Sequence, residues 1–183
     1  RALTQSGTVV DFYSLNASQG VYYIIYTEYN GRYYAVTYSD TTKKYGIGQE
    51  ITVNGSTVTW NSGDSSIYWN FERNGYGGSY FISNFANGKY IHAFDNSYGG
   101  NQDYGSMTTG RNSSQLTAKE NGTFIIRGNN YYTGIQNSGG QIRFERVSGE
   151  ANAAKFKLAL VGTVYNVWFD GTCGGMMSYY GAG

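Results

Sequence analysis

The sequence predicts an all-β fold, on the strength of three observations. Short runs rich in Tyr, Val, Ile, Thr and Phe alternate with Asn-Gly and Gly-rich segments, which is the pattern of strands joined by tight turns. One hairpin-like segment occurs three times along the chain. No segment sustains the 3.6-residue apolar period of an amphipathic helix, and only residues 150–155 could form a short helical turn.

Length and charge restrict the class of protein. The 183 residues fit one domain and are enough to bury about 70% of the surface that the unfolded chain exposes. With 13 Lys and Arg against 12 Asp and Glu, the formal net charge is +1, so no strong field attracts nucleic acid or an anionic membrane. The apolar runs are much shorter than the roughly 20 residues of a membrane span. We therefore expect neither a nucleic-acid partner nor membrane insertion.

The composition is typical of secreted or surface proteins of bacteria. Charged residues make up 14% of the chain, whereas about a quarter is usual, and Gly and Tyr are abundant. The single cysteine, Cys173, excludes an internal disulfide, which is ordinary for an exoprotein of a Gram-positive bacterium. A buried or inert thiol, an intermolecular disulfide and a thioester stay open as roles for Cys173. We expect an extracellular or cell-wall location, within a larger chain that carries neighbouring domains.

Residues 79–94 are predicted to form a strand, a tight turn and a second strand. Its turn is expected at Asn87–Gly88, because a two-residue type I′ turn needs positive φ at both central positions, which Asn and Gly adopt most readily. A similar segment surrounds Asn30–Gly31 in residues 23–35, and a shorter one occupies residues 123–133.

Further Asn-Gly pairs divide the chain into three repeats. Asn74–Gly75 and Asn121–Gly122 mark the boundaries, so we expect repeats at about 21–77, 78–122 and 123–161. A lead-in strand precedes them, and an extra strand with a Gly-rich tail, or the start of a next module, follows them: residues 1–20 and 162–183.

Each repeat ends on a strand with apolar alternation. In the first repeat, alternation over residues 67–71 predicts that Ile67, Trp69 and Phe71 share one face. The corresponding segments of the other repeats are residues 115–118 and 155–160.

The number of repeats distinguishes between closed all-β folds. A propeller needs at least four blades, and an immunoglobulin-like sandwich gives no reason for three copies of a hairpin. The pattern resembles the β-trefoil, the fold of ricin-type and fascin-like modules. The resemblance implies a six-stranded barrel capped by three hairpins, with Ile25, Ile82 and Ile126 at equivalent core positions.

The segment after the repeats allows two interpretations. Residues 164–178 contain Asp-Gly-Thr-x-Gly-Gly, which resembles segments that join modules in wall-anchored proteins of Gram-positive bacteria. Alternatively, these residues form a strand that pairs with residues 9–12 beside the trefoil.

The sugar-binding motif of ricin-type modules is missing. The resemblance places their sugar-binding Asp directly after the strand that corresponds to Tyr90–Ile91. In the three repeats that position is held by Ala35, His92 and Thr133, and the Gln-x-Trp motif is also absent. We therefore expect no galactose-type site in the manner of that family.

Signatures of catalysis are absent from the sequence. With His92 as the only histidine, no site of two His ligands for a metal can form, and no nucleophile elbow or phosphate loop occurs. Asp95 and Asp103 are candidates for a pair of catalytic carboxylates, but both belong to one loop, whereas such pairs normally project from separate rigid strands. The sequence predicts that the protein is not an enzyme and needs no cofactor or metal.

Aromatic residues give the positive signal. The 20 Tyr, 9 Phe and 3 Trp exceed what a barrel interior holds, so many tyrosines must lie on the surface, in cross-strand pairs or at a ligand. Tyr combined with Asn, Asp and Gln is typical of sugar sites and also of protein-binding surfaces. The loop of residues 95–105 has this composition. We predict a ligand site in the second repeat formed by His92, Asp95, Asn96, Tyr98, Asn101, Asp103 and Tyr104. For His92 itself, a structural role is the alternative.

These observations lead to a ranked functional prediction. The first is a non-catalytic, lectin-like glycan-binding or adhesion module of a secreted or cell-surface bacterial protein. The first alternative is an adhesin or stalk module that binds a host protein, and the second is a glycoside hydrolase-associated module or weak hydrolase.

Overall fold

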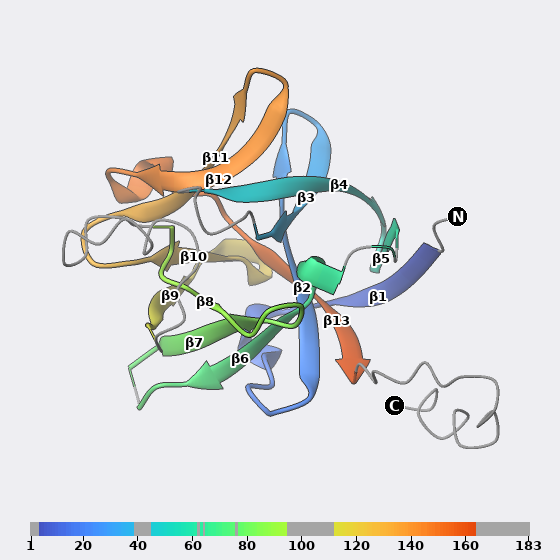
Figure 1. Ribbon diagram of the computed structural model, residues 1–183, viewed down its shortest axis with the longest axis horizontal. Helices are drawn as coiled ribbons and strands as arrows, with labels where there is room; N and C mark the ends of the chain where they lie inside the picture. The colour runs from blue at the N-terminus through green and yellow to red at the C-terminus, as the bar shows by residue number, and fades with distance from the viewer. Residues whose placement is uncertain are drawn as a thin grey trace.

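The computed structural model describes residues 4–38, 45–61, 63, 65–75, 77–94 and 112–163, which form one antiparallel β structure (Figure 1). The strands are β1 Thr4–Val10, β2 Val21–Tyr29, β3 Arg32–Thr37, β4 Gly46–Asn54, β5 Thr57–Asn61, β6 Trp69–Arg73, β7 Ser79–Asn84, β8 Tyr90–Ile91, β9 Ser114–Ala118, β10 Phe124–Arg127, β11 Tyr132–Ser138, β12 Gln141–Val147 and β13 Lys157–Thr163. Within the described ranges, four short 3₁₀ turns accompany them: η1 Phe12–Ser14, η2 Ser65–Ile67, η5 Glu120–Gly122 and η6 Glu150–Asn152.

The prediction of an all-β fold is confirmed. The described residues contain no α-helix, and η6 lies where the sequence predicts a short helical turn. None of the helical segments in this part of the chain has the length and hydrophobicity of a membrane span.

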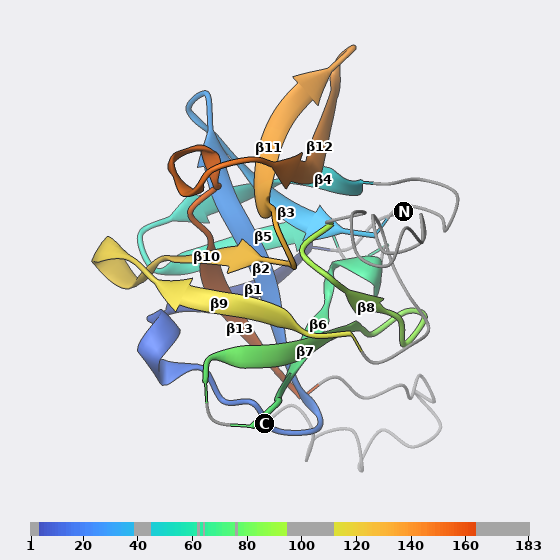
Figure 2. The same cartoon turned by 90° about the vertical axis from the view of Figure 1, so that its left-hand side faces the viewer.

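Six strands, β2, β6, β7, β9, β10 and β13, form a closed ring. Neighbouring strands pair antiparallel around it, and Phe124 and Phe156 complete the ring between β10 and the start of β13. These two residues exchange backbone hydrogen bonds of 3.0 and 2.8 Å. Figure 2 shows the ring from the side of β7, β9 and β10. The ring agrees with the six-stranded barrel of a trefoil-like fold.

The ring encloses the first hydrophobic core. Ile25, Ile82 and Ile126 all lie in it and are at most 1% exposed. The strands that end the predicted repeats contribute Trp69, Phe71, Leu116, Phe156 and Leu158. The threefold repetition of capping hairpins stays a prediction, because residues 95–111 of the second repeat lie outside the described residues.

A second ring of six strands shares part of the first. β2 pairs with β13, β13 with β1, β1 with β5, β5 with β4, β4 with β3, and β3 again with β2. This ring encloses a separate core that includes Tyr26, Ile51, Val58 and Trp60. β4 also pairs with β12, which joins the second ring to the β11–β12 hairpin. The sequence does not predict this second core.

Strands β2, β3 and β13 separate the two cores. Because successive side chains of a strand point to opposite faces, Tyr23 and Ile25 enter the first core while Ile24 and Tyr26 enter the second. Figure 1 shows β2 and β13 crossing the middle of the molecule, with β1 and β5 on one side and β6, β7, β9 and β10 on the other. A strand buried on both faces carries a continuous apolar run, as residues 23–26 do.

The predicted turn at Asn87–Gly88 is wrong in its detail. Only Gly88 has positive φ, at 69°, and its N–H donates to the carbonyl oxygen of Asn84 at 2.8 Å. The Asn87 side chain accepts a hydrogen bond from the N–H of Lys89 at 2.9 Å. This local bond favours a longer loop over the two-residue type I′ turn.

The corresponding turn of the first hairpin agrees with the prediction. Asn30 and Gly31 have φ of 52° and 77°, and the flanking residues Tyr29 and Arg32 pair directly. The loop is therefore a two-residue turn with positive φ at both central positions, as type I′ requires.

The predicted alternation of Ile67 with Trp69 and Phe71 is also wrong. Ile67 lies in η2 and packs in the second core. Trp69 and Phe71 lie in β6, and their side chains pack in the first core. The chain leaves η2 through Tyr68, whose hydroxyl accepts a hydrogen bond from Trp60 Nε1 at 3.1 Å. The side chains of Ile67 and Tyr68 thus pack in the second core, just before β6 begins.

The N-terminal strand β1 lies between two other strands. Val9 and Val10 pair with Ala159 and Leu158 of β13, and residues 4–8 pair with β5. The extra strand predicted in residues 164–178, and Cys173 with it, lie outside the described residues.

Candidate functional site

The structure describes one residue of the predicted ligand site, His92. The other six lie outside the described residues: Asp95, Asn96, Tyr98, Asn101, Asp103 and Tyr104. His92 is 8% exposed, and its Nδ1 lies 2.8 Å from the carbonyl oxygen of Ser113. This contact connects the residue after β8 to the residue before β9, and it is compatible with a structural role as well as with a place at the edge of a ligand site.

The backbone that leads into the predicted loop is held in an unusual conformation. Ala93 and Phe94 both have positive φ, at 52° and 55°, and both side chains are buried. Two hydrogen bonds hold Ala93: its N–H donates to Ser114 Oγ at 3.0 Å, and its carbonyl oxygen accepts from Thr133 Oγ1 at 2.7 Å. Left-handed backbone costs a non-glycine residue about 1–2 kcal/mol and persists only where the surroundings enforce it.

A polar cleft of about 480 Å³ lies beside β8, between β6, β7 and the segment that precedes β2. Its lining consists of Ala17, Gln19, Asn70, Phe71, Glu72, Ser83 and Tyr90. We refer to it as the β6–β8 cleft. The sequence prediction did not include these residues.

Strand pairing arranges one wall of the β6–β8 cleft. Asn70 of β6 pairs with Ser83 of β7, and Ser83 pairs with Tyr90 of β8. Because Trp69 and Phe71 point into the first core, the side chain of Asn70 between them points outward. The three polar residues therefore form a row across the outer face of the barrel.

Asn70 also holds the opposite wall in place. Its Nδ2 donates to the carbonyl oxygens of Ser18 and Val21, at 2.8 and 3.1 Å. Both amide hydrogens are thus used for structure. Its Oδ1 accepts no hydrogen bond within the described ranges and is available to a donor in the cleft.

Three further groups of the cleft have unused hydrogen-bonding capacity. The Gln19 amide, the Ser83 hydroxyl and the Tyr90 hydroxyl make no hydrogen bond to any other residue that the structure describes. The Tyr90 ring stands edge-on to Phe81, with centroids 6.2 Å apart and an interplanar angle of 77°. This contact restricts how the Tyr90 ring can turn.

The cleft offers donors, acceptors and one aromatic ring, but few charges. Among the lining residues that the structure describes, Glu72 is the only acid, and none is basic. Hydrolysis by two carboxylates needs a pair about 5–10 Å apart. Across the described ranges, no group of three or more His, Cys, Asp and Glu residues is arranged to hold a metal.

The sequence matches no protein-family description and no curated protein. Several solved structures are similar in shape. An endo-β-galactosidase from Clostridium perfringens that releases GlcNAcα1-4Gal is 14% identical, with 77% of this chain and 32% of that chain covered and a TM-score of 0.49. The BEL β-trefoil is 16% identical, with 81% and 99% covered and a TM-score of 0.48. A Polyporus squamosus lectin is 13% identical, with 79% and 50% covered and a TM-score of 0.47.

This chain thus spans about a third of the galactosidase and half of the lectin. At these identities and TM-scores we infer neither a ligand nor an activity from the likenesses.

Proposed function

We propose that the protein is a non-catalytic glycan-binding module and that the β6–β8 cleft binds the sugar. The observation that carries the proposal is the convergence of four polar groups with unused hydrogen-bonding capacity beside an oriented tyrosine ring. Asn70 Oδ1 is an acceptor, the hydroxyls of Ser83 and Tyr90 both donate and accept, and the Gln19 amide does the same. Sugar hydroxyls need this mixture of partners.

Size and charge favour a neutral sugar over other ligands. A volume of about 480 Å³ falls within the range of about 300–1,000 Å³ that is usual for small-molecule sites. Since none of the described lining residues is Lys or Arg, these residues offer no counter-ion to a phosphate or sulfate group. Glu72 adds an acceptor for hydroxyl groups, and the Tyr90 ring offers an apolar surface to a pyranose.

The residues predicted from the sequence belong to the same proposal. His92 and the loop that contains Tyr98 and Asp103 follow Tyr90 directly in the chain. We propose that this loop extends the sugar site. An extracellular or cell-wall location, as part of a larger bacterial protein, fits such a module.

A glycan array followed by calorimetry tests the proposal. We expect dissociation constants between about 1 μM and 1 mM, and a loss of about tenfold or more in Tyr90→Ala, which corresponds to about 1.4 kcal/mol. Ser83→Ala should weaken binding by a smaller factor. Tyr13→Ala is the matched control, since Tyr13 is 80% exposed and lies outside the cleft lining.

Other outcomes decide between the alternatives. Sugar binding that survives Tyr90→Ala but is lost in Tyr98→Ala would move the site to the loop. No sugar binding at all, together with capture of a host protein, would favour the adhesin. Sugar hydrolysis that persists in the double variant Asp95→Asn and Asp103→Asn would refute the assignment of these acids and the non-catalytic proposal.

A further inference from the structure

A second cavity, of about 350 Å³, lies where the β2–β3 hairpin meets the chain between η6 and β13. We refer to it as the β2–β13 cavity. It combines apolar and basic side chains, among them Tyr26, Tyr33, Ile135, Ala154, Lys155 and Lys157. The β6–β8 cleft shares none of its lining residues.

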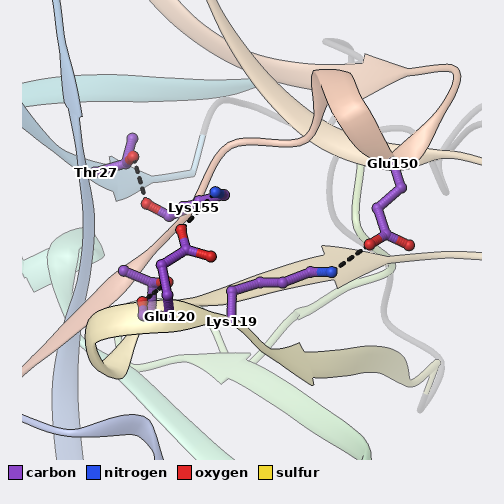
Figure 3. A network of polar contacts seen from close by, with 6 residues as sticks. Thr27, Lys119, Glu120, Glu150 and Lys155 are labelled. Atoms are coloured by element: carbon purple, nitrogen blue, oxygen red, sulfur yellow. Dashed lines mark hydrogen bonds and ion pairs between the residues drawn. The ribbon is translucent and has the colours of Figure 1, made fainter.

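Hydrogen bonds and ion pairs fix one wall of this cavity. Thr27 Oγ1 donates to the carbonyl oxygen of Lys155 at 2.7 Å, which holds the start of β13 against β2. The ammonium group of Lys155 pairs with Glu120, and the neighbouring Lys119 pairs with Glu150 (Figure 3). The charge of Lys155 is therefore already compensated by Glu120.

Lys157 forms no ion pair with any acid that the structure describes. Its side chain lines the cavity and is only partly exposed, and in the described part of the chain its ammonium group makes neither an ion pair nor a hydrogen bond. Glu28 lines the cavity too, but it is exposed and forms no ion pair with Lys157. Among the described lining residues, Lys155, Lys157 and Glu28 are charged, and Lys157 is the cation without an ion pair.

Tyr26 adds a hydrogen-bond donor to the same cavity. The residue is 2% exposed, and its hydroxyl forms no hydrogen bond with any described residue. Burial, with a smaller contribution from Tyr33, raises the pKa of Tyr26 to about 12, so the hydroxyl keeps its proton at neutral pH. Tyr26 lines the cavity, so its hydroxyl, which has no hydrogen-bond partner among the described residues, is a donor available to a ligand there.

We propose that the β2–β13 cavity binds a small organic carboxylate, whose oxygens accept hydrogen bonds from the Lys157 ammonium group and the Tyr26 hydroxyl. One cation without an ion pair matches one negative charge. Ile135 and Ala154 supply apolar surface for the body of the ligand, which an inorganic anion would leave unused. This site is independent of the sugar site.

Calorimetric titration with three probes tests the site. Benzoate should bind saturably, and benzamide, of the same shape without the charge, should bind about tenfold or more weakly. Inorganic phosphate, which has no apolar body, should also bind more weakly than benzoate. Similar affinities for benzoate and benzamide, tighter binding of phosphate, or no saturable binding of benzoate would overturn the proposal.

Substitutions then assign the contacts. Lys157→Gln should abolish benzoate binding, and Tyr26→Phe should weaken it several-fold, while circular dichroism checks that both variants are folded. Lys89→Gln removes the same charge from the β7–β8 loop and should have no effect. Unchanged benzoate binding in Lys157→Gln would contradict the proposal. Tyr90→Ala should leave benzoate binding intact, which separates this test from that of the sugar site.

Discussion

At the scale of single residues, Gly7 shows how the absence of a side chain permits the second core. A Cβ atom at Gly7 would lie 2.7 Å from the carbonyl oxygen of Leu160 and 3.2 Å from the nearest atom of the Trp60 ring. The first distance is to backbone, which cannot move without disturbing the pairing of β1 with β13. The close approach of β1, β13 and Trp60 therefore depends on glycine at this position.

We predict that Gly7→Ala lowers the free energy of unfolding by about 1–3 kcal/mol, the usual cost of overpacking. Urea denaturation followed by tryptophan fluorescence measures it. Gly63→Ala is the control, because a Cβ atom there meets nothing within 4 Å. Equal stability of the two variants would show that the backbone at Gly7 adapts freely.

Asn70 illustrates how one side chain serves the fold and the proposed site together. Its amide nitrogen bonds to Ser18, 52 positions away in the sequence, and its oxygen is left for a ligand. The sequence does indicate that Asn70 points outward, since it stands between the apolar residues Trp69 and Phe71. It contains no signal that residues 17–19 cross over this strand, so the cleft could not be predicted from it.

At the scale of elements, the hairpins distinguish features that the local sequence determines from features that depend on distant segments. The strands follow from alternation and the turns from Asn-Gly pairs, so most strands of the trefoil-like ring could be predicted. The turn at Asn30–Gly31 has the predicted positive φ at both residues. At the second hairpin the Asn87 side chain instead accepts a hydrogen bond from the N–H of Lys89 in the same loop. The role of β1 and β5 in a second ring depends on pairings between distant segments, which local patterns do not encode.

We predict that Asn30→Ala destabilises the protein by about 1–2 kcal/mol, because alanine must then adopt the left-handed conformation at φ of 52°. Thermal or urea unfolding measures the loss. Asn129→Ala is the matched control in the β10–β11 loop, where Asn129 is exposed and its φ is not positive. A loss in Asn129→Ala as large as in Asn30→Ala would contradict this account.

At the scale of the whole molecule, tyrosines with raised pKa values make the stability of the fold depend on pH in the alkaline range. Burial raises the pKa of Tyr22 and Tyr23 above the usual 10.0, and burial together with Tyr33 raises that of Tyr26 to about 12. Above pH 10 an unfolded tyrosine loses its proton while these folded ones keep theirs. The folded state then binds more protons, so its stability falls as the pH rises.

We predict that the free energy of unfolding falls between pH 10 and about pH 12, and that Tyr26→Phe makes the fall shallower. At about 1.4 kcal/mol for each pH unit, and less as the folded pKa is approached, the contribution of Tyr26 amounts to roughly 2 kcal/mol at pH 12. Urea denaturation at a series of pH values measures it. Tyr13→Phe, at an 80% exposed side chain, is the control. The same slope in Tyr26→Phe and the unsubstituted protein would refute the prediction.

The pairing of β1 with β13 also affects how the chain folds during synthesis. Residues 8–10 pair with residues 158–160, and β13 belongs to both rings. A chain made from its N-terminus therefore cannot close either ring until Thr163 has left the ribosome. Until then β2 exposes two apolar faces, which favours aggregation. These faces become buried only when slow, long-range contacts form. Both rings therefore close only after β13 has been synthesised.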